Sequence, residues 1–169
     1  MRVIGIDPGT IRLGYGIIEH DAGRLKAVGF GVITSAARKP IENKLCSIHN
    51  GLKKVFEQYS PEQVALEEPF VSDNARSALS IGRAQAIAML AAGERELPIF
   101  RYSPAQVKFQ VTSYGRSDKQ QVNEMVKLQL GLRNQEIPED AADALAVAIC
   151  HITQAHLNDL ASRGQAAKQ

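Results

Sequence analysis

The sequence predicts an α/β fold, in which one domain is built on a mixed five-stranded sheet with helices on both faces. Three short strand-like segments joined by turns come first, and helical and strand-like segments alternate after them. The chain has 169 residues, of which 44% are hydrophobic and 22% charged, as in an ordinary globular protein with a substantial core. No linker or low-complexity segment indicates a second domain.

Short apolar runs bounded by glycine or turn residues predict the strands. The five strands are expected at Arg2–Asp7, Leu13–His20, Arg24–Thr34, Gln63–Glu67 and Leu97–Tyr102. Asp21-Ala22-Gly23 should join the second and third strands as a tight hairpin. The fourth strand is continuously apolar until its closing acid, which is typical of a strand buried in a parallel sheet.

Apolar residues at spacings of three and four, together with helix-end signals, predict five helices. They are expected at Pro40–Tyr59, Asn74–Glu94, Ser103–Val111, Ser117–Leu130 and Pro138 to about His156. Ser117 and Gln120 have the spacing of a capping box, and Gly131 ends the same helix. Small and apolar residues surround the helix at 74–94, so we expect it to be buried on more than one side, inside the domain or in a subunit contact.

We expect residues 1–157 to form the folded domain and residues 158–169 to form a flexible C-terminal tail. No apolar run approaches the roughly 20 residues that cross a bilayer, so no membrane partner is expected. Cys46 and Cys150 fall in helical patterns without a CxxC spacing, which favours reduced thiols. The chain enters its first strand without a signal-peptide pattern, and a cytoplasmic location is expected.

Four carboxylates stand where folding can bring them together: Asp7, Glu67, Asp140 and Asp143. Asp7 and Glu67 each end a predicted strand, and parallel pairing of those strands would leave the two acids side by side. Asp140 and Asp143 are three residues apart in the last helix and therefore share one face. Clustered carboxylates repel one another, so a fold that gathers four of them usually binds a cation there.

The expected cation is Mg²⁺, with Mn²⁺ as a substitute, because oxygen ligands without a Cys or His pattern suit these ions better than zinc. Two such ions, roughly 3.5–4 Å apart, would serve the attacking water and the leaving 3′ oxygen of a phosphodiester. Asp7 is the expected bridging ligand, and Glu67 and Asp143 would each complete one ion. Asp140 would bind metal directly or act from outside the ligand set.

The distribution of charge is compatible with a nucleic-acid partner, although the net charge is only +2. Basic residues outnumber acidic ones at 1–56 and 101–133, whereas acidic residues are in excess at 57–100 and 134–169. This observation alone leaves two interpretations of the basic segments open. They could form a phosphate-binding rim beside the acids, or they could be an ordinary solvated surface.

The opening motif GIDPGT at 5–10 is ambiguous by itself, because an acid at a strand end followed by Gly and Thr also begins the phosphate loop of actin-like ATPases and sugar kinases. Those proteins need two such domains, and 169 residues supply one. A larger set of motifs decides the matter: GIDPGT at 5–10, GYG at 14–16, VALEEPF at 64–70, NARSAL at 74–79, QVK at 106–108, KQQV at 119–122 and DAADALAVAICH at 140–151. With these motifs, in this order and over residues 1 to about 157, the chain resembles the RuvC family of Holliday-junction resolvases in the ribonuclease-H-like superfamily.

The resemblance implies a ribonuclease-H-like fold and gives roles to the matching residues. These are the metal-binding catalytic acids Asp7, Glu67, Asp140 and Asp143, the aromatic Phe70 that wedges against bases at the junction centre, and the lysines Lys108 and Lys119 near the scissile phosphate. Some relatives carry His in place of Asp140. Tyr114 and Arg116, in the loop before Lys119, are further candidates for DNA binding.

Each of these residues also has a simpler interpretation. Asp7 would cap the loop that follows it, and Asp140 and Asp143 would be acids that the helix dipole favours near a helix start. Phe70 would be a core residue, and the two lysines would be ordinary surface residues. Glu68 adds a carboxylate whose role stays open. The four histidines form no ligand set and are expected to be structural, although His151 shares a helical stripe with Asp143.

We therefore expect a Mg²⁺-dependent endonuclease that resolves four-way DNA junctions by paired symmetric nicks in homologous recombination and DNA repair, leaving 5′-phosphate and 3′-hydroxyl ends. The resemblance implies a homodimer, for which the helix at 74–94 is the candidate contact, and branch-migration proteins as partners. The alternatives are an RNA-processing nuclease of the related YqgF type and a junction-binding protein without catalysis. Cleavage of a junction, a linear duplex and a structured RNA, with and without Mg²⁺, separates them.

Overall fold

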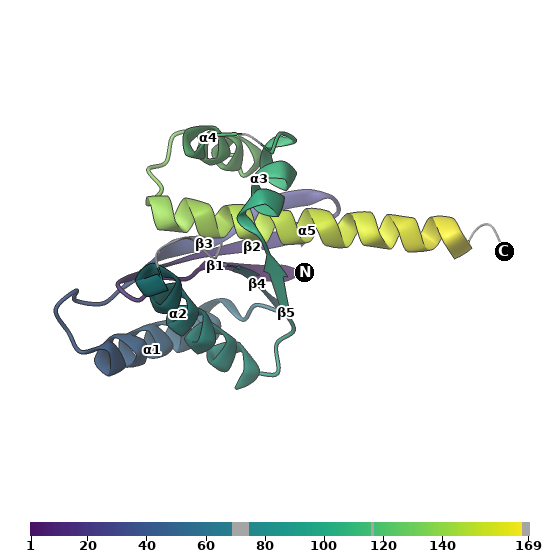
Figure 1. Ribbon diagram of the computed structural model, residues 1–169. Helices are drawn as coiled ribbons and strands as arrows, with labels where there is room; N and C mark the ends of the chain where they lie inside the picture. Colours follow the sequence, from purple (N-terminus) through teal and green to yellow (C-terminus); the bar gives the residue numbers. More distant parts are fainter. Residues whose placement is uncertain (69–74, 116, 167–169) are drawn as a thin grey trace.

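The computed structural model describes residues 1–68, 75–115 and 117–166, with the backbone alone for 160 and 163–166. Its centre is a five-stranded sheet in the order β3-β2-β1-β4-β5 (Figure 1). The strands are β1 (Arg2–Asp7), β2 (Arg12–Asp21), β3 (Arg24–Thr34), β4 (Gln63–Glu67) and β5 (Ile99–Tyr102). Strand β2 runs antiparallel to both β1 and β3, whereas β1, β4 and β5 are parallel to one another, so the expected mixed sheet is confirmed.

The β2–β3 connection is the expected tight hairpin. Asp21 pairs with Arg24, which leaves Ala22 and Gly23 as the two turn residues. Their φ angles are 45° and 80°, and a two-residue hairpin turn with positive φ at both positions matches the right-handed twist of the strands.

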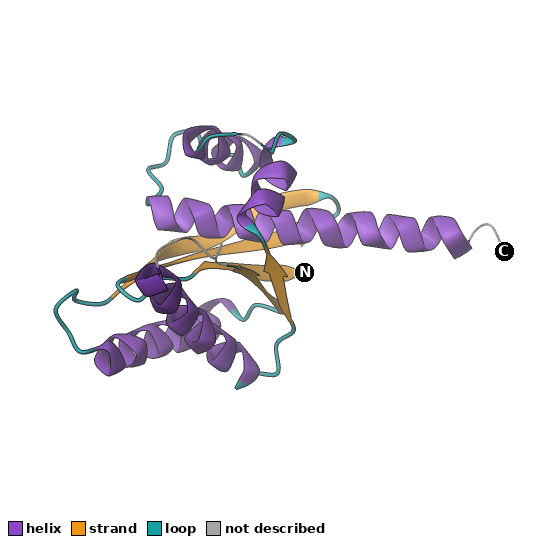
Figure 2. Cartoon of the chain, viewed as in Figure 1, coloured by secondary structure: helices purple, strands orange, loops and turns teal. Residues whose placement is uncertain are grey.

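Helices cover both faces of the sheet (Figures 1 and 2). They are α1 (Ile41–Tyr59), α2 (Ala75–Gly93), α3 (Pro104–Thr112), α4 (Lys119–Gln129) and α5 (Glu139–Ala166). Helices α1 and α2 pack on one face, and α5 crosses the other, with α3 and α4 packed against it. Alternate residues of β1 enter the two cores, since Val3 packs with the α5 side whereas Ile4 and Ile6 pack with the α1 side.

Helix α5 packs closely on β1 and β2, because the strands present glycine to it. A Cβ on Gly5 would overlap the carbonyl oxygen of Ala144, and one on Gly14 would overlap that of Asp140. Gly14 is paired with Asp7 across the two strands. The first turns of α5 are therefore held directly beside the end of β1.

The start of α4 differs from the expectation. Its N-cap is Asp118, which forms a capping box with Gln121, so the assignment of Ser117 and Gln120 to these positions was wrong by one residue. The Ser117 hydroxyl instead donates to Thr112 Oγ1 at 2.8 Å and lies 2.9 Å from the carbonyl oxygen of Tyr114. Asp and Ser are both good caps, and the loop contacts of Ser117 decide between them.

Two other helices also differ from the expectation. Within a single chain α2 is buried on one side only, through Ala84, Ala88, Ala91 and Ala92, while Leu79 and Leu90 are more than half exposed. Helix α5 continues to Ala166, so its expected end at about His156 was wrong. Residues 157–166 contain no proline, so no missing backbone donor interrupts the helix there. In the described part of the chain, none of the helices combines the length and apolarity needed to span a membrane.

We predict that Gly5→Ala destabilises the fold, because the added methyl group would push α5 off β1. Urea unfolding should report a loss of about 1–3 kcal/mol in unfolding free energy. Gly82→Ala is the matched control, since an added Cβ there meets no described atom within 4 Å and α2 is helical at that point. It should be neutral or stabilising by up to about 1 kcal/mol. Equal losses in both variants would contradict the packing constraint.

Candidate active site

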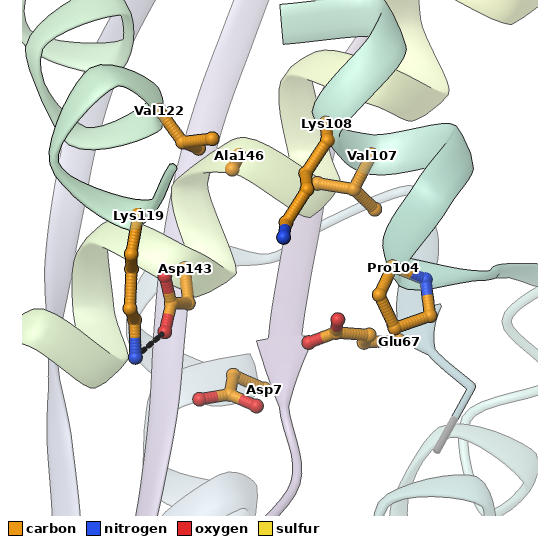
Figure 3. A pocket seen from close by; sticks show the side chains of 9 residues that line it. All are labelled: Asp7, Glu67, Pro104, Val107, Lys108, Lys119, Val122, Asp143 and Ala146. Atoms are coloured by element: carbon orange, nitrogen blue, oxygen red, sulfur yellow. Dashed lines mark ion pairs between the residues drawn. The ribbon is translucent and has the colours of Figure 1, made fainter. Parts of the chain in front are cut away.

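Three acids and two lysines from separate elements line one cavity of about 330 Å³ (Figure 3). The acids are Asp7, Glu67 and Asp143, and both lysines, Lys108 and Lys119, point toward them. The remaining lining residues form a mostly apolar wall: Pro104, Val107, Val122 and Ala146. With every group ionised, the three carboxylates leave one negative charge uncompensated by the two lysines.

Strand pairing explains why Asp7 and Glu67 meet. Ile6 is the register partner of Leu66 in the parallel β1–β4 pair, so the next residue on each strand is the acid. Because side chains alternate along a strand, Asp7 lies on the same face as Gly5, beneath α5. The expectation that parallel strands bring these two acids together is confirmed.

Asp143 reaches the cavity from the first turns of α5, where it meets Lys119 at the start of α4. The Nζ atom of Lys119 lies 3.0 Å from Oδ2 of Asp143 and also forms an ion pair with Glu139 (Figure 3 draws the Asp143 contact). The capping box at Asp118 fixes the first turn of α4, and this sets the backbone position from which the Lys119 side chain extends.

The surroundings of the cavity raise the pKa values of both strand acids. Burial raises the pKa of Asp7 to about 6, and the negative charges of Asp143 and Asp140 add to this effect. Burial also raises the pKa of Glu67 to about 7, reinforced by the charges of Asp7 and Asp143. The Lys119 charge opposes both shifts without cancelling them.

Asp143 and Lys119 form an ion pair, and each changes the pKa of the other. Burial raises the pKa of Asp143, and the hydrogen bond and charge of Lys119 offset part of that rise. Burial by itself would lower the pKa of Lys119, but its bonds to Glu139 and Asp143 outweigh burial and raise it. Lys119 therefore stays charged at neutral pH and neutralises part of the site.

The donor set has the chemistry of a Mg²⁺ or Mn²⁺ site. It consists of carboxylate oxygens with no Cys or His beside them. Burial, and after it the neighbouring negative charges, raise the pKa values of Asp7 and Glu67, and a bound cation would favour their ionised forms. Within the described residues, no three acidic, His or Cys side chains converge closely enough to form a complete metal-binding group. Lys119 contacts Oδ2 of Asp143 in this arrangement and so competes with a cation for that oxygen.

The structure places Asp140 at the rim of this cavity, apart from the other three acids. Its Oδ2 atom lies 2.6 Å from Nη2 and 2.8 Å from Nε of Arg12, at the start of β2. Asp140 is not among the described residues that line the cavity, although its charge contributes to the raised pKa of Asp7. Three of the four predicted acids are thus brought together, and the fourth is held beside them.

The other predicted site residues fall into different surroundings. Lys108 and Lys119 line the cavity, while Tyr114 lies in the α3–α4 loop with 59% of its side chain exposed. Glu68 faces a different hollow, beside Arg101, because adjacent strand residues point to opposite faces. Phe70 and Arg116 lie outside the described residues.

The expectation that His151 is structural agrees with its surroundings. His151 is buried between Tyr102, whose hydroxyl lies 2.7 Å from Nδ1, and Gln63, whose Oε1 lies 2.7 Å from Nε2. Burial lowers its pKa to about 4, so it is neutral at neutral pH. It packs against the Phe100 ring at a centroid distance of 4.4 Å.

Sequence reasoning missed two residues, Arg12 and Glu139. Glu139 precedes Asp140 in the helix start, and its helical position predicts proximity to the acids but not its partner Lys119. Arg12 is separated from Asp140 by 128 positions, and no sequence pattern signals that contact.

Comparisons with known proteins agree with this geometry. The family described as "Crossover junction endodeoxyribonuclease RuvC" matches residues 3–151. The chain belongs to the RuvC family. A RuvC relative from Dehalococcoides mccartyi is 49% identical over 97% of this chain and 98% of its own length. One from Chloroflexus aggregans is 44% identical over 89% of this chain and 92% of its own length.

Solved RuvC structures also match. That of "T. thermophilus RuvC in complex with Holliday junction substrate" has a TM-score of 0.87 and 33% identity, covering 94% of this chain and 96% of that one. The yeast mitochondrial resolvase Ydc2, with a TM-score of 0.64 and 14% identity, shares the fold. The expected ribonuclease-H-like fold and RuvC resemblance are therefore confirmed.

We predict that Asp7→Asn raises the Tm of the metal-free RuvC-family protein at pH 8. Raised carboxyl pKa values mean that the folded state binds these protons more tightly than the unfolded state. The protonated carboxyl groups therefore contribute fully to the free energy of unfolding below about pH 4. This contribution is lost as the pH rises through the folded-state pKa values, about 6 for Asp7 and about 7 for Glu67. Removing one charge should recover on the order of 1–3 kcal/mol, or about 2–4 °C for each kcal/mol.

Thermal unfolding with EDTA at pH 8 and pH 4 tests this expectation. The gain should disappear at pH 4, where both carboxyls are protonated. Asp21→Asn, in the exposed hairpin at the far end of β2, is the matched control and should leave the Tm unchanged at both values. A gain of equal size at pH 4 and pH 8 would refute charge crowding as its cause.

Proposed function

We propose that the protein is a divalent-metal-dependent endonuclease that resolves four-way DNA junctions by paired nicks, leaving 5′-phosphate and 3′-hydroxyl ends, in homologous recombination and DNA repair. One observation carries the proposal: two strand ends and a distant C-terminal helix deliver three carboxylates into one cavity beside two lysines. Family membership supports the substrate, since the related Thermus RuvC was solved with a Holliday junction.

Asp7, Glu67 and Asp143 are the proposed metal ligands, and Asp140 is the proposed fourth acid acting from the rim. Two Mg²⁺ ions, replaceable by Mn²⁺, are the expected occupants because all these donors are carboxylate oxygens. When bound, such ions lower the pKa of the attacking water and stabilise charge on the phosphate and the leaving oxygen. Asp7 ends the central strand β1 and lines the cavity with both other acids, so it would be the ligand common to the two ions.

The lysines give the cavity its affinity for the substrate anion. A phosphodiester is repelled by three carboxylates, and Lys108 and Lys119 supply positive charge at the same wall. With Asp143 serving a cation, Lys119 would be available to donate to a phosphate oxygen, and its ion pair with Glu139 would keep the side chain in place. Such a donor stabilises the charge that develops in the transition state.

Two symmetric nicks call for two sites, and we propose a homodimer formed through α2. This helix exposes a stripe of apolar and small residues, Leu79, Ala86 and Leu90, on the side away from its buried alanines. The spacing of seven and four residues puts the three on one helical face. Large exposed apolar side chains on one helix are suited to an isologous contact.

The remaining assignments also stay proposals. Phe70, Arg116 and Tyr114 are the candidates for contact with junction DNA, and branch-migration proteins are the expected partners. A cytoplasmic location is supported by two free thiols, the exposed Cys46 and the buried Cys150, which suit a reducing compartment. The folded unit is proposed to span residues 1–157, although α5 runs through this boundary to Ala166.

We predict that Ala86→Arg, which places charge in the middle of the α2 stripe, converts the dimer into a monomer. Light scattering coupled to gel filtration measures the mass directly. Lys44→Glu, on α1 rather than on α2, is a charge-changing control and should leave the mass unchanged. A wild-type protein that is monomeric at all concentrations would refute the dimer itself.

We predict that Asp143→Asn retains junction binding and loses cleavage by on the order of 10²–10³-fold or more, because one charge that serves the cation is gone. Asp21→Asn is the matched control and should cleave normally. The assay uses a synthetic four-way junction with a fixed branch point, and the nicks are mapped on opposing strands with Mg²⁺ and with EDTA.

The outcomes separate the alternatives. Symmetric Mg²⁺-dependent nicks support junction resolution, and scattered nicks on linear duplex would favour a general nuclease. Preferred cleavage of structured RNA would favour a YqgF-type activity. Binding without cleavage at any Mg²⁺ concentration would favour a catalytically inactive junction-binding protein.

A further inference from the structure

The contact between Arg12 and Asp140 is built into the fold. Arg12 opens β2, and two residues later Gly14 lies under the backbone of Asp140, where no Cβ would fit. Strand alternation puts Arg12 on the same face as Gly14, so its side chain starts directly below the first turn of α5. The two side chains meet because this close backbone approach fixes their origins.

Both polar contacts of this pair end on one oxygen. Nε of Arg12 lies 2.8 Å and Nη2 lies 2.6 Å from Oδ2 of Asp140, and the Asp140 side chain is only 26% exposed. A guanidinium is always charged and its two donors are rigidly spaced, so the Oδ2 atom of Asp140 is held beside Arg12. With Oδ2 held there, Asp140 stays at the rim, outside the described lining of the cavity.

We infer that Arg12 is a positioning residue that holds Asp140 out of the cation-binding set and thereby weakens divalent-cation binding at the cavity. This inference rests on the metal site proposed above. Asp143 has a comparable partner in Lys119, but that lysine lines the cavity, whereas Arg12 contacts the rim acid. Arg12 thus acts on the site through Asp140.

The size of the effect follows from the exposure of the pair. Arg12 is 52% exposed, and ion pairs at such positions are weakened by solvent. Freeing Asp140 to turn toward the cavity should therefore tighten cation binding moderately, by about 3–10-fold, rather than by many orders of magnitude.

A double-mutant cycle on the full chain tests the inference with Mn²⁺ as the probe. The electron paramagnetic resonance signal of free Mn²⁺ gives the Kd without any need for DNA cleavage. Four proteins are compared at constant pH and ionic strength: the unmodified chain, Arg12→Gln, Asp140→Asn and the double variant. Arg24→Gln, at the opposite end of the β2–β3 pair, controls for the loss of one positive charge.

Arg12→Gln should lower the Kd by about 3–10-fold when Asp140 is present, and by less than about twofold in the Asp140→Asn background. Equal tightening in both backgrounds would mean a long-range charge effect and would overturn the positioning role. An unchanged Kd for Arg12→Gln, or the same tightening for Arg24→Gln, would also overturn it. If the unmodified chain binds no Mn²⁺, the proposed metal site fails and the inference fails with it.

Discussion

The close contact of α5 with β1 and β2 is the constraint on which the site depends. Glycine at positions 5 and 14 removes the side chains that would separate helix from sheet. The helix therefore carries Asp143 to the end of β1, where Asp7 already lies beside Glu67. With ordinary side chains at the two glycines, the same helix would lie further from the sheet, and Asp143 would lie further from the two strand acids.

This arrangement is costly for the fold, because burial and mutual repulsion raise the pKa values of Asp7 and Glu67. The same helix offsets the cost elsewhere. From Ala141 to Ile152 nearly every residue of α5 is buried or half-buried, and this apolar surface packs on β1 and β2 and against α3 and α4. A helix anchored so firmly along its length can hold repelling groups at its beginning.

Much of this was predictable from the sequence, and the misses have specific causes. Strand periodicity and the apolar run before each acid predicted the β1–β4 pairing of Asp7 and Glu67, because both signals are local. The partner of Asp140 was not predictable, since the contact with Arg12 depends on how α5 is seated on β2. The sequence also did not show that α2 is buried on one side only within a single chain, because small residues permit close packing but do not say on which side a neighbour lies.

The acids of the site differ in how their charge is balanced, and the difference follows from the elements that carry them. Both helix acids have a cation within 3.0 Å, Arg12 for Asp140 and Lys119 for Asp143. Among the described residues, neither strand acid forms an ion pair, and these are the two whose pKa values rise to about 6 and about 7. The demand for an external cation is therefore concentrated between the ends of β1 and β4. In each helix acid the Oδ2 atom already contacts a basic side chain, so cation binding at these acids is coupled to the side chains of Arg12 and Lys119.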